Sequence, residues 1–143
     1  YWRDWSSDVC SSDLGAGLDP RVTFFVAGVP AMCDHTGSEV NRIAGWPKFI
    51  PTGQPATPEV REAVRYFDGV NFAAQSRAAG FFTVGFIDAT CPPTTVYAAY
   101  NALGSPKRIF NDIPTGHANS PAAREAMRAA VLEHFAAQAA RGR

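Results

Sequence analysis

The stretch FFTVGFID, residues 81–88, decides the fold prediction for this chain. Its first seven residues carry no charge and are mostly aromatic or branched, which is typical of a strand buried on both faces of a parallel sheet. Asp88 follows at once, and the residues CPP come at 91–93 as a loop. We therefore predict a buried strand over Phe81–Ile87, with a carboxylate directly beyond its end.

Two further runs predict neighbouring strands. Residues Arg21–Ala27, RVTFFVA, are rich in β-branched and aromatic side chains and are closed by Gly28 and Pro30. Lys107–Asp112 is the third strand candidate. Short runs of this kind fit the buried strands of an α/β protein, because the segments between them are long enough to hold helices.

Pairs of a hydroxyl residue and a proline mark two helix starts. Thr57-Pro58 and Ser120-Pro121 each place an N-cap hydroxyl before a proline in the first helical turn. The expected helices cover residues 38–44, 58–67, 71–77, 94–103 and the segment after Pro121. Buried strands that alternate with helices predict an α/β fold, a mostly parallel sheet flanked by helices, with no linker that would divide it.

The first residues do not fit this pattern. Residues 4–14, DWSSDVCSSDL, have no helical or strand period and match the in-frame translation of a sequencing-library adapter. The alternative is a natural, disordered N-terminus rich in Ser and Asp. We expect residues 1–14 to be non-native and residues 15–143 to be the C-terminal part of a domain whose N-terminal part is absent. An incomplete sheet would leave an apolar strand edge unpaired, so we also expect poor solubility of the chain alone.

Composition excludes several classes of partner. The 143 residues are 46% hydrophobic and 18% charged with a formal net charge of zero, so no basic surface is expected for a nucleic acid. No apolar run approaches the roughly 18 residues that would cross a membrane. Once Cys10 is set aside with the adapter-like segment, Cys33 and Cys91 remain, at unrelated places. They predict neither a disulfide framework nor a zinc site, and they favour a reduced, cytosolic compartment.

Two ionisable side chains lie at expected strand ends. Asp88 follows the strand 81–87, and His117 lies in the loop after Lys107–Asp112. Because the carboxyl ends of parallel strands share one edge of a sheet, these side chains can meet. A carboxylate that accepts from one ring nitrogen fixes the tautomer and leaves the other nitrogen to act as a general base. Acid before base is also the chain order of an α/β-hydrolase triad.

Plainer interpretations of individual residues stay open. Asp88 alone fits a turn or cap before the helix that begins near Thr94, and His117 alone fits a surface loop. His35 is expected to have a structural or pocket-wall role rather than to bind a metal, and His134 to be a half-buried helix residue. One aromatic group fits a core or a subunit contact and, secondarily, the wall of an acyl or sugar pocket: Trp46, Phe49, Tyr66, Phe67 and Phe72.

A nucleophile is missing from the pattern. The elbow motif G-x-S-x-G occurs nowhere in the sequence, and Cys33 lacks the flanking glycines of a cysteine elbow. The oxyanion hole needs the backbone N–H that follows the nucleophile. We expect both features to lie before Gly15.

The string D-x-x-C-P-P-x-x-x-x-A-x-x-N, residues 88–101, resembles the region around the catalytic acid in the acetyl-xylan esterase / cephalosporin-C deacetylase family, carbohydrate esterase family seven. The similarity extends from Leu18 to about Phe135. Shorter strings that also resemble the family occur in the same order: LDPRV at 18–22, VP at 29–30, CDH at 33–35, RYFD at 65–68, NFA at 71–73 and GH at 116–117.

This resemblance implies an α/β-hydrolase with a Ser–Asp–His triad and no metal or organic cofactor. It puts Asp88 at the acid position and His117 at the base position. The implied reaction is hydrolysis of short acyl esters, chiefly acetyl, on sugars or small alcohols by a cytoplasmic homo-oligomer. Ala118-Asn119 departs from the family, in which an acidic residue is common here, and this leaves the fine substrate preference open. The alternative is another α/β-hydrolase, such as a peptidase or a dienelactone-type hydrolase.

Overall fold

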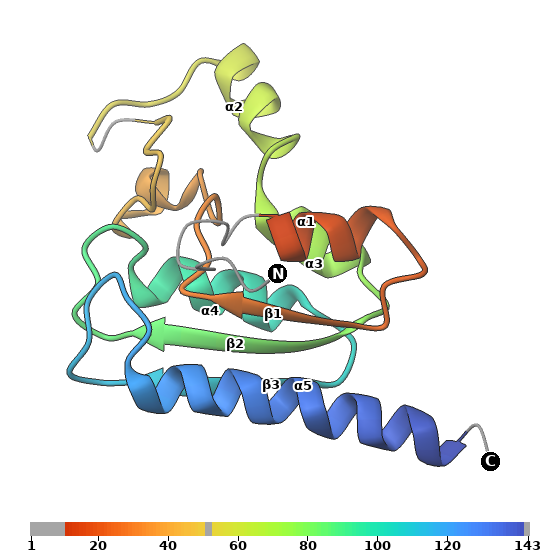
Figure 1. The fold of residues 1–143 in the computed structure, drawn as a ribbon. Helices are drawn as coiled ribbons and strands as arrows, with labels where there is room; N and C mark the ends of the chain where they lie inside the picture. The colour runs from red at the N-terminus through yellow and green to blue at the C-terminus, as the bar shows by residue number, and fades with distance from the viewer. Residues whose placement is uncertain (1–10, 51–52, 142–143) are drawn as a thin grey trace.

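Three parallel strands form the sheet in the computed structural model, which describes residues 11–50 and 53–141 (Figure 1). They are β1 (Phe24–Gly28), β2 (Ala79–Gly85) and β3 (Lys107–Asp112), in the order β1-β2-β3. Gly28 pairs with Thr83, and Gly85 pairs with Asp112. All three predicted strands are confirmed, and their carboxyl ends lie at one edge of the sheet.

The end of β2 differs from the prediction in a way that matters for the site. β2 stops at Gly85, so Phe86 and Ile87 lie in a turn and Asp88 is not directly beyond the strand. The N–H of Ile87 donates to the backbone oxygen of Thr115 at 3.2 Å, in the loop that follows β3. Phe86 still donates to the backbone oxygen of Asp112 at the end of β3, and the ladder ends there because the partner of Ile87 lies in a loop rather than in a strand.

The helices follow the capping residues closely. Thr57 accepts from the N–H of Val60 at the first turn of α2, as expected. Asp68 accepts from the N–H of Val70, and this cap starts α3 two residues before the predicted position. Among the described helices, none is both long and apolar enough to cross a membrane. In chain order they are α1 (Ser11–Leu18), the 3-10 helix η1 (Gly37–Val40), α2 (Pro58–Arg65), α3 (Gly69–Gln75), α4 (Pro93–Ala102) and α5 (Pro121–Arg141).

Helix α1 was not predicted from the sequence pattern. Of the adapter-like segment 1–14, residues 1–10 lie outside the described residues, and α1 begins at Ser11 and continues through Gly15. It packs against α3, where Gly17 permits a close approach: a Cβ at this position would lie 2.7 Å from the backbone oxygen of Phe72. The helix therefore crosses the expected boundary after Leu14.

Helices cover both faces of the sheet, as Figure 1 shows. α5 runs along one face and contacts all three strands. On the opposite face, α3 contacts both α1 and α4, and these three helices form a layer. α2 lies beyond that layer. The predicted α/β fold, a parallel sheet flanked by helices, is confirmed.

The core lies between the sheet and the layer of α1, α3 and α4. Phe25 and Ala27 on β1 and Phe82 on β2 point toward this layer and are almost fully buried. The rings of Phe25 and Phe82 meet edge to face, with centroids 5.5 Å apart. The helical side of the core is built mainly from small side chains, together with one leucine: Ala16, Ala73, Ala99 and Leu103.

The expectation that the aromatic group belongs to the core is wrong for four of its five members. Trp46, Phe49, Tyr66 and Phe67 are 47–70% exposed, and Phe72 is half-buried. Trp46 and Phe49 lie on the long segment between β1 and α2, and Tyr66 and Phe67 directly follow α2. The core is instead filled by β1, β2 and the layer of α1, α3 and α4. A subunit contact stays a prediction for this group.

Phe82 gives the sharpest test of this core. Replacing Phe82 with Ala removes a ring that is fully buried between β1 and α4, so we expect a loss of about 3–5 kcal/mol in the free energy of unfolding. Leu132→Ala on α5, where the side chain is 53% exposed, is the control and is expected to change it by less than about 0.5 kcal/mol. Equal losses in urea unfolding of the two variants would contradict this placement of the core.

Candidate active site

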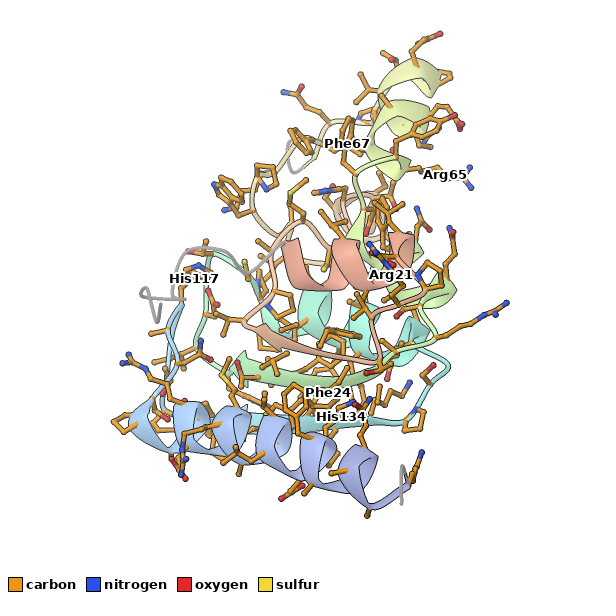
Figure 2. The ribbon with its side chains drawn as sticks, turned by 45° about the vertical axis from the view of Figure 1, so that its right-hand side comes forward. Arg21, Phe24, Arg65, Phe67, His117 and His134 are labelled. Carbon is orange, nitrogen blue, oxygen red and sulfur yellow. The ribbon has the colours of Figure 1, made fainter. Side chains whose placement is uncertain are left out.

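Asp88 and His117 meet at the carboxyl edge of the sheet. His117 Nδ1 lies 2.9 Å from Asp88 Oδ2, although the residues belong to loops that follow different strands. Figure 2 shows His117 at the edge where the strands end, beyond the start of α5. The predicted convergence of these two side chains is confirmed.

Asp88 uses each of its carboxylate oxygens for a different purpose. Oδ1 accepts from the N–H of Thr90 at 2.7 Å and from the N–H of Cys91 at 2.9 Å, which shapes the turn before α4. Oδ2 is left for His117. The side chain is fully buried, so the turn holds the carboxylate in one position. The turn interpretation and the pairing interpretation of Asp88 are therefore both correct, on opposite oxygens.

The hydrogen bond orients the imidazole of His117. An ionised carboxylate can only accept, so the pair requires the proton of the neutral ring on Nδ1 and leaves a lone pair on Nε2. The His117 side chain is 41% exposed, in contrast to its buried partner. Among the described residues, no group hydrogen-bonds to Nε2. The ring can therefore take a proton at Nε2 while Asp88 stabilises the resulting imidazolium.

Glycines at the strand ends make room for the loop that carries His117. A Cβ at Gly85, the last residue of β2, would overlap the backbone oxygens of Thr115 and Gly116. A Cβ at Gly28, the last residue of β1, would lie 2.6 Å from Asn119 Nδ2. The loop thus approaches the end of β2 through its backbone and the end of β1 through the Asn119 side chain, which places His117 beside Asp88.

Cys91 brings a third metal-ligating group close to the pair. The ligand atoms of Asp88, Cys91 and His117 lie within 4.8 Å of one another. In the described part of the chain, no other cluster of three such residues lies this close together. Two ligands about 2.0–2.1 Å from a tetrahedral zinc ion lie roughly 3.3 Å apart. Oδ2 of Asp88 and Nδ1 of His117 are closer than this and share a direct hydrogen bond, so the geometry favours acid–base chemistry.

The other two histidines lie elsewhere. His134 on α5 is half-buried, as expected: its ring stacks on Phe24 at 4.7 Å, and Nε2 lies 3.0 Å from Thr23 Oγ1 (Figure 2). His35 is buried against Phe49. Its pKa is lowered, because the effect of burial is larger than the opposing effect of the nearby Asp68 carboxylate. His35 is not part of the metal-ligating group around Asp88.

Sequence reasoning missed two residues that hold the His117 loop. The Asp112 carboxylate accepts from Thr115 Oγ1 and from the N–H of Ser120, and Asn119 accepts from Thr83 Oγ1. A polar residue at the end of a strand is a weak signal, because such residues often only cap turns. The signal that could have found Asp112 is its place at the start of the loop that contains the candidate base.

No hydrogen bond joins His117 to any of the four serines whose side chains the structure describes, Ser38, Ser76, Ser105 and Ser120. The hydroxyl of Ser120, three residues along the chain, instead caps α5 by accepting from the N–H of Ala123. Ser38, Ser76 and Ser105 form hydrogen bonds elsewhere in the fold. These contacts agree with the absence of an elbow motif from the sequence.

Comparison with known proteins gives consistent results. The family model described as acetyl xylan esterase (AXE1) matches residues 14–132. The acetyl esterase Axe7A of Xylanibacter ruminicola is 44% identical over 92 residues, which cover 64% of this chain and 21% of the relative.

Solved structures with a similar fold include two acetyl xylan esterases. The enzyme from Paenibacillus sp. R4 has a TM-score of 0.72 and 29% identity, over 85% of this chain and 41% of that one. Acetyl xylan esterase 1 from a Thermoanaerobacterium species has a TM-score of 0.63 and 29% identity, over 74% of this chain and 36% of that one. An acylaminoacyl peptidase from Pyrococcus horikoshii, at 17% identity and a TM-score of 0.61, shares the fold alone.

The parallel sheet, its two helical layers and the Asp–His pair at the strand ends define the class of an α/β-hydrolase. Within that class, the chain belongs to the acetyl xylan esterase family, because the family model matches most of its length. The chain spans less than half the length of each of the relatives named above.

Gly85 gives a direct test of this geometry. In Gly85→Ala the new methyl group would meet the backbone of Thr115 and Gly116, so we expect the loop to shift and the hydrogen bond between Asp88 and His117 to break. The measurement is the distance between these two side chains in a crystal structure of the variant. Gly104→Ala is the control, because a Cβ there meets no atom within 4 Å. An unchanged 2.9 Å contact in Gly85→Ala would show that the close approach is not required.

Proposed function

We propose that the chain supplies the acid and the base of a serine esterase that removes acetyl groups from xylo-oligosaccharides or related small acetyl esters. The observation that carries the proposal is the hydrogen bond between the buried carboxylate of Asp88 and the half-exposed imidazole of His117. Membership of the acetyl xylan esterase family supports the choice of ester and of acyl group.

The geometry fits a two-step acyl transfer. A serine hydroxyl attacks the acetyl carbonyl while Nε2 of His117 takes its proton, and the imidazolium then gives that proton to the leaving sugar oxygen. In the second step water attacks the acetyl-serine, again with His117 as base, and acetate leaves as the serine recovers its proton. Asp88 holds the ring and stabilises its charged form throughout.

The nucleophile in this proposal comes from sequence upstream of Gly15. No G-x-S-x-G motif occurs in the chain, and the relatives extend well beyond the region that the chain covers. The oxyanion hole, which includes the N–H after the serine, would come from the same upstream region. It follows that the 143-residue chain alone has no triad-dependent activity.

A peptidase or a dienelactone-type hydrolase is the weaker alternative. The peptidase named above shares only the fold, whereas the family model and the sequence relative are both esterases. The upstream sequence discriminates between the two, because a serine elbow followed by Gln-Gly-Gly favours the esterase. A cytoplasmic location and a homo-oligomeric assembly are parts of the proposal that the family resemblance suggests.

The test compares two proteins: the 143-residue chain, and a longer protein in which residues 15–143 follow the coding sequence found upstream of Gly15 in the genome. We expect the longer protein to release acetate from acetylated xylo-oligosaccharide and the chain alone to release none above background. His117→Ala in the longer protein should lower kcat by at least about 10³-fold, because the base is lost.

His134→Ala is the matched control, since His134 is half-buried on α5 and lies outside the pair. It should change kcat by no more than about twofold. Hydrolysis by the 143-residue chain that disappears in His117→Ala would contradict the proposal, because it would require a serine within the chain. Preference of the longer protein for a peptide anilide over the acetyl ester would favour the alternative.

A further inference from the structure

The loop that carries His117 begins at Asp112, the last residue of β3, and both of its carboxylate oxygens tie down that loop. Oδ1 accepts from Thr115 Oγ1 at 2.7 Å, and Oδ2 accepts from the N–H of Ser120 at 3.1 Å. These two contacts lie two residues before His117 and three residues after it. The carboxylate therefore closes the loop around the imidazole.

The same residue joins this loop to the one that carries Asp88. The backbone oxygen of Asp112 accepts from the N–H of Phe86 at 3.3 Å and from the N–H of Thr115 at 3.1 Å. Thr115 in turn accepts from the N–H of Ile87 at 3.2 Å. The two loops are thus linked by hydrogen bonds just before Asp88 on one side and His117 on the other.

A second anchor holds the far side of the loop. Asn119 Oδ1 accepts from Thr83 Oγ1 in the middle of β2, and Thr83 Oγ1 itself accepts from the N–H of Val29 beyond β1. Asn119 also lies over Gly28, where any larger residue would meet it. The loop is therefore fixed to β1 and β2 as well as to β3.

The surroundings of Asp112 fit an anchoring role. The residue is only 6% exposed, and no ion pair links it to a cation in the described part of the chain. Burial raises the pKa of its carboxyl, but hydrogen bonds from Ser120 and Thr115 outweigh burial and lower the pKa below the usual value. The carboxylate is therefore ionised at neutral pH and is stabilised by the donors of the loop that it closes.

We propose that Asp112 is a positioning residue for the esterase reaction: by accepting hydrogen bonds from Thr115 and Ser120, it holds His117 within reach of Asp88. This inference depends on the proposed function, since it assigns Asp112 a role in keeping the base of that reaction in place. The hydrogen bonds of the Asp112 side chain go to Thr115 and Ser120 and not to Asp88 or His117. Its effect passes through the backbone of the loop.

The two obvious substitutions have different consequences. Asp112→Ala removes both acceptors, so the loop loses its closure and the imidazole is no longer held against Asp88. Asp112→Asn retains one oxygen for the N–H of Ser120, and its amide can donate to Thr115 Oγ1, which accepts as readily as it donates. The asparagine variant should therefore keep the loop in place.

The first measurement is steady-state hydrolysis of an acetyl ester by the longer protein. Asp112→Ala should lower kcat by about 10²-fold with KM changed by less than about threefold, because a misplaced base affects the chemical step and not the binding of the ester. The separate variant Asp112→Asn should retain a kcat within about fivefold of that of the parent. If kcat falls as far in Asp112→Asn as in Asp112→Ala, the inference is overturned.

Asp68→Ala is the matched control. Asp68 is 7% exposed and accepts from the backbone N–H groups of Asp34, His35 and Val70, far along the chain from the His117 loop. It should lower Tm as Asp112→Ala does, while kcat stays within about threefold of the parent. An equal fall in kcat for both variants would reduce the role of Asp112 to general stability and overturn the inference.

The second measurement does not depend on activity. A proton on Nδ1 of His117 that is shared with Asp88 gives a far-downfield NMR signal, which is assigned by its loss in His117→Gln. The signal should disappear in Asp112→Ala and persist in Asp112→Asn and Asp68→Ala. If the longer protein hydrolyses no acetyl ester and the signals still follow this pattern, the proposed function fails while the positioning role stands.

A variant that retains one anchor covers the case in which Asp112→Ala does not fold. Thr115→Val removes only the hydroxyl that donates to Oδ1 of Asp112 and retains the contact with Ser120. It should lower kcat by several-fold and broaden the His117 signal. Full kcat with an unchanged signal in Thr115→Val would overturn the inference.

Discussion

The hydrogen bond between Asp88 Oδ2 and His117 Nδ1 depends on the parallel pairing of β2 with β3. Because Gly85 and Asp112 pair at the last step of the ladder, the two loops leave the sheet side by side. The absence of a side chain at Gly85 then lets them touch through their backbones. A shift of one residue in this register would separate the carboxylate from the imidazole. The site is therefore a consequence of the sheet geometry, and burial of Asp88 fixes the result.

Much of this arrangement could be predicted from the sequence because its signals are local. The uncharged run at 81–87 and the similar runs near Arg21 and Lys107 indicated three strands, and parallel strands bring their carboxyl ends together. Asp88 and His117 could be paired by that rule together with their order in the chain, acid before base. The turn that separates β2 from Asp88 could not be predicted, because the hydrogen bonds that end the strand come from a loop almost thirty residues further along the chain.

Other features depend on tertiary contacts that leave little trace in the sequence. Asp112 resembles any polar residue at a strand end until the loop closes around its carboxylate. Trp46 and Phe49, between β1 and α2, are residue types common in cores but lie outside this one. The space over β1 and β2 is already filled by small helical side chains. Helix α1 was not predicted because residues 11–14 were set aside with the adapter-like segment, and its packing against α3 depends on the close approach of Gly17 to Phe72.

The central claim is that Asp88 and His117 act as one catalytic unit, and a double-mutant cycle on acetyl-ester hydrolysis by the longer protein tests it most directly. Asp88→Asn, His117→Ala and the double variant are compared with the parent through kcat/KM. If the carboxylate works only through the imidazole, the double variant loses no more activity than His117→Ala alone, so the coupling energy is about as large as the whole effect of Asp88→Asn. Losses that simply add would show that the two residues act independently and would contradict the account.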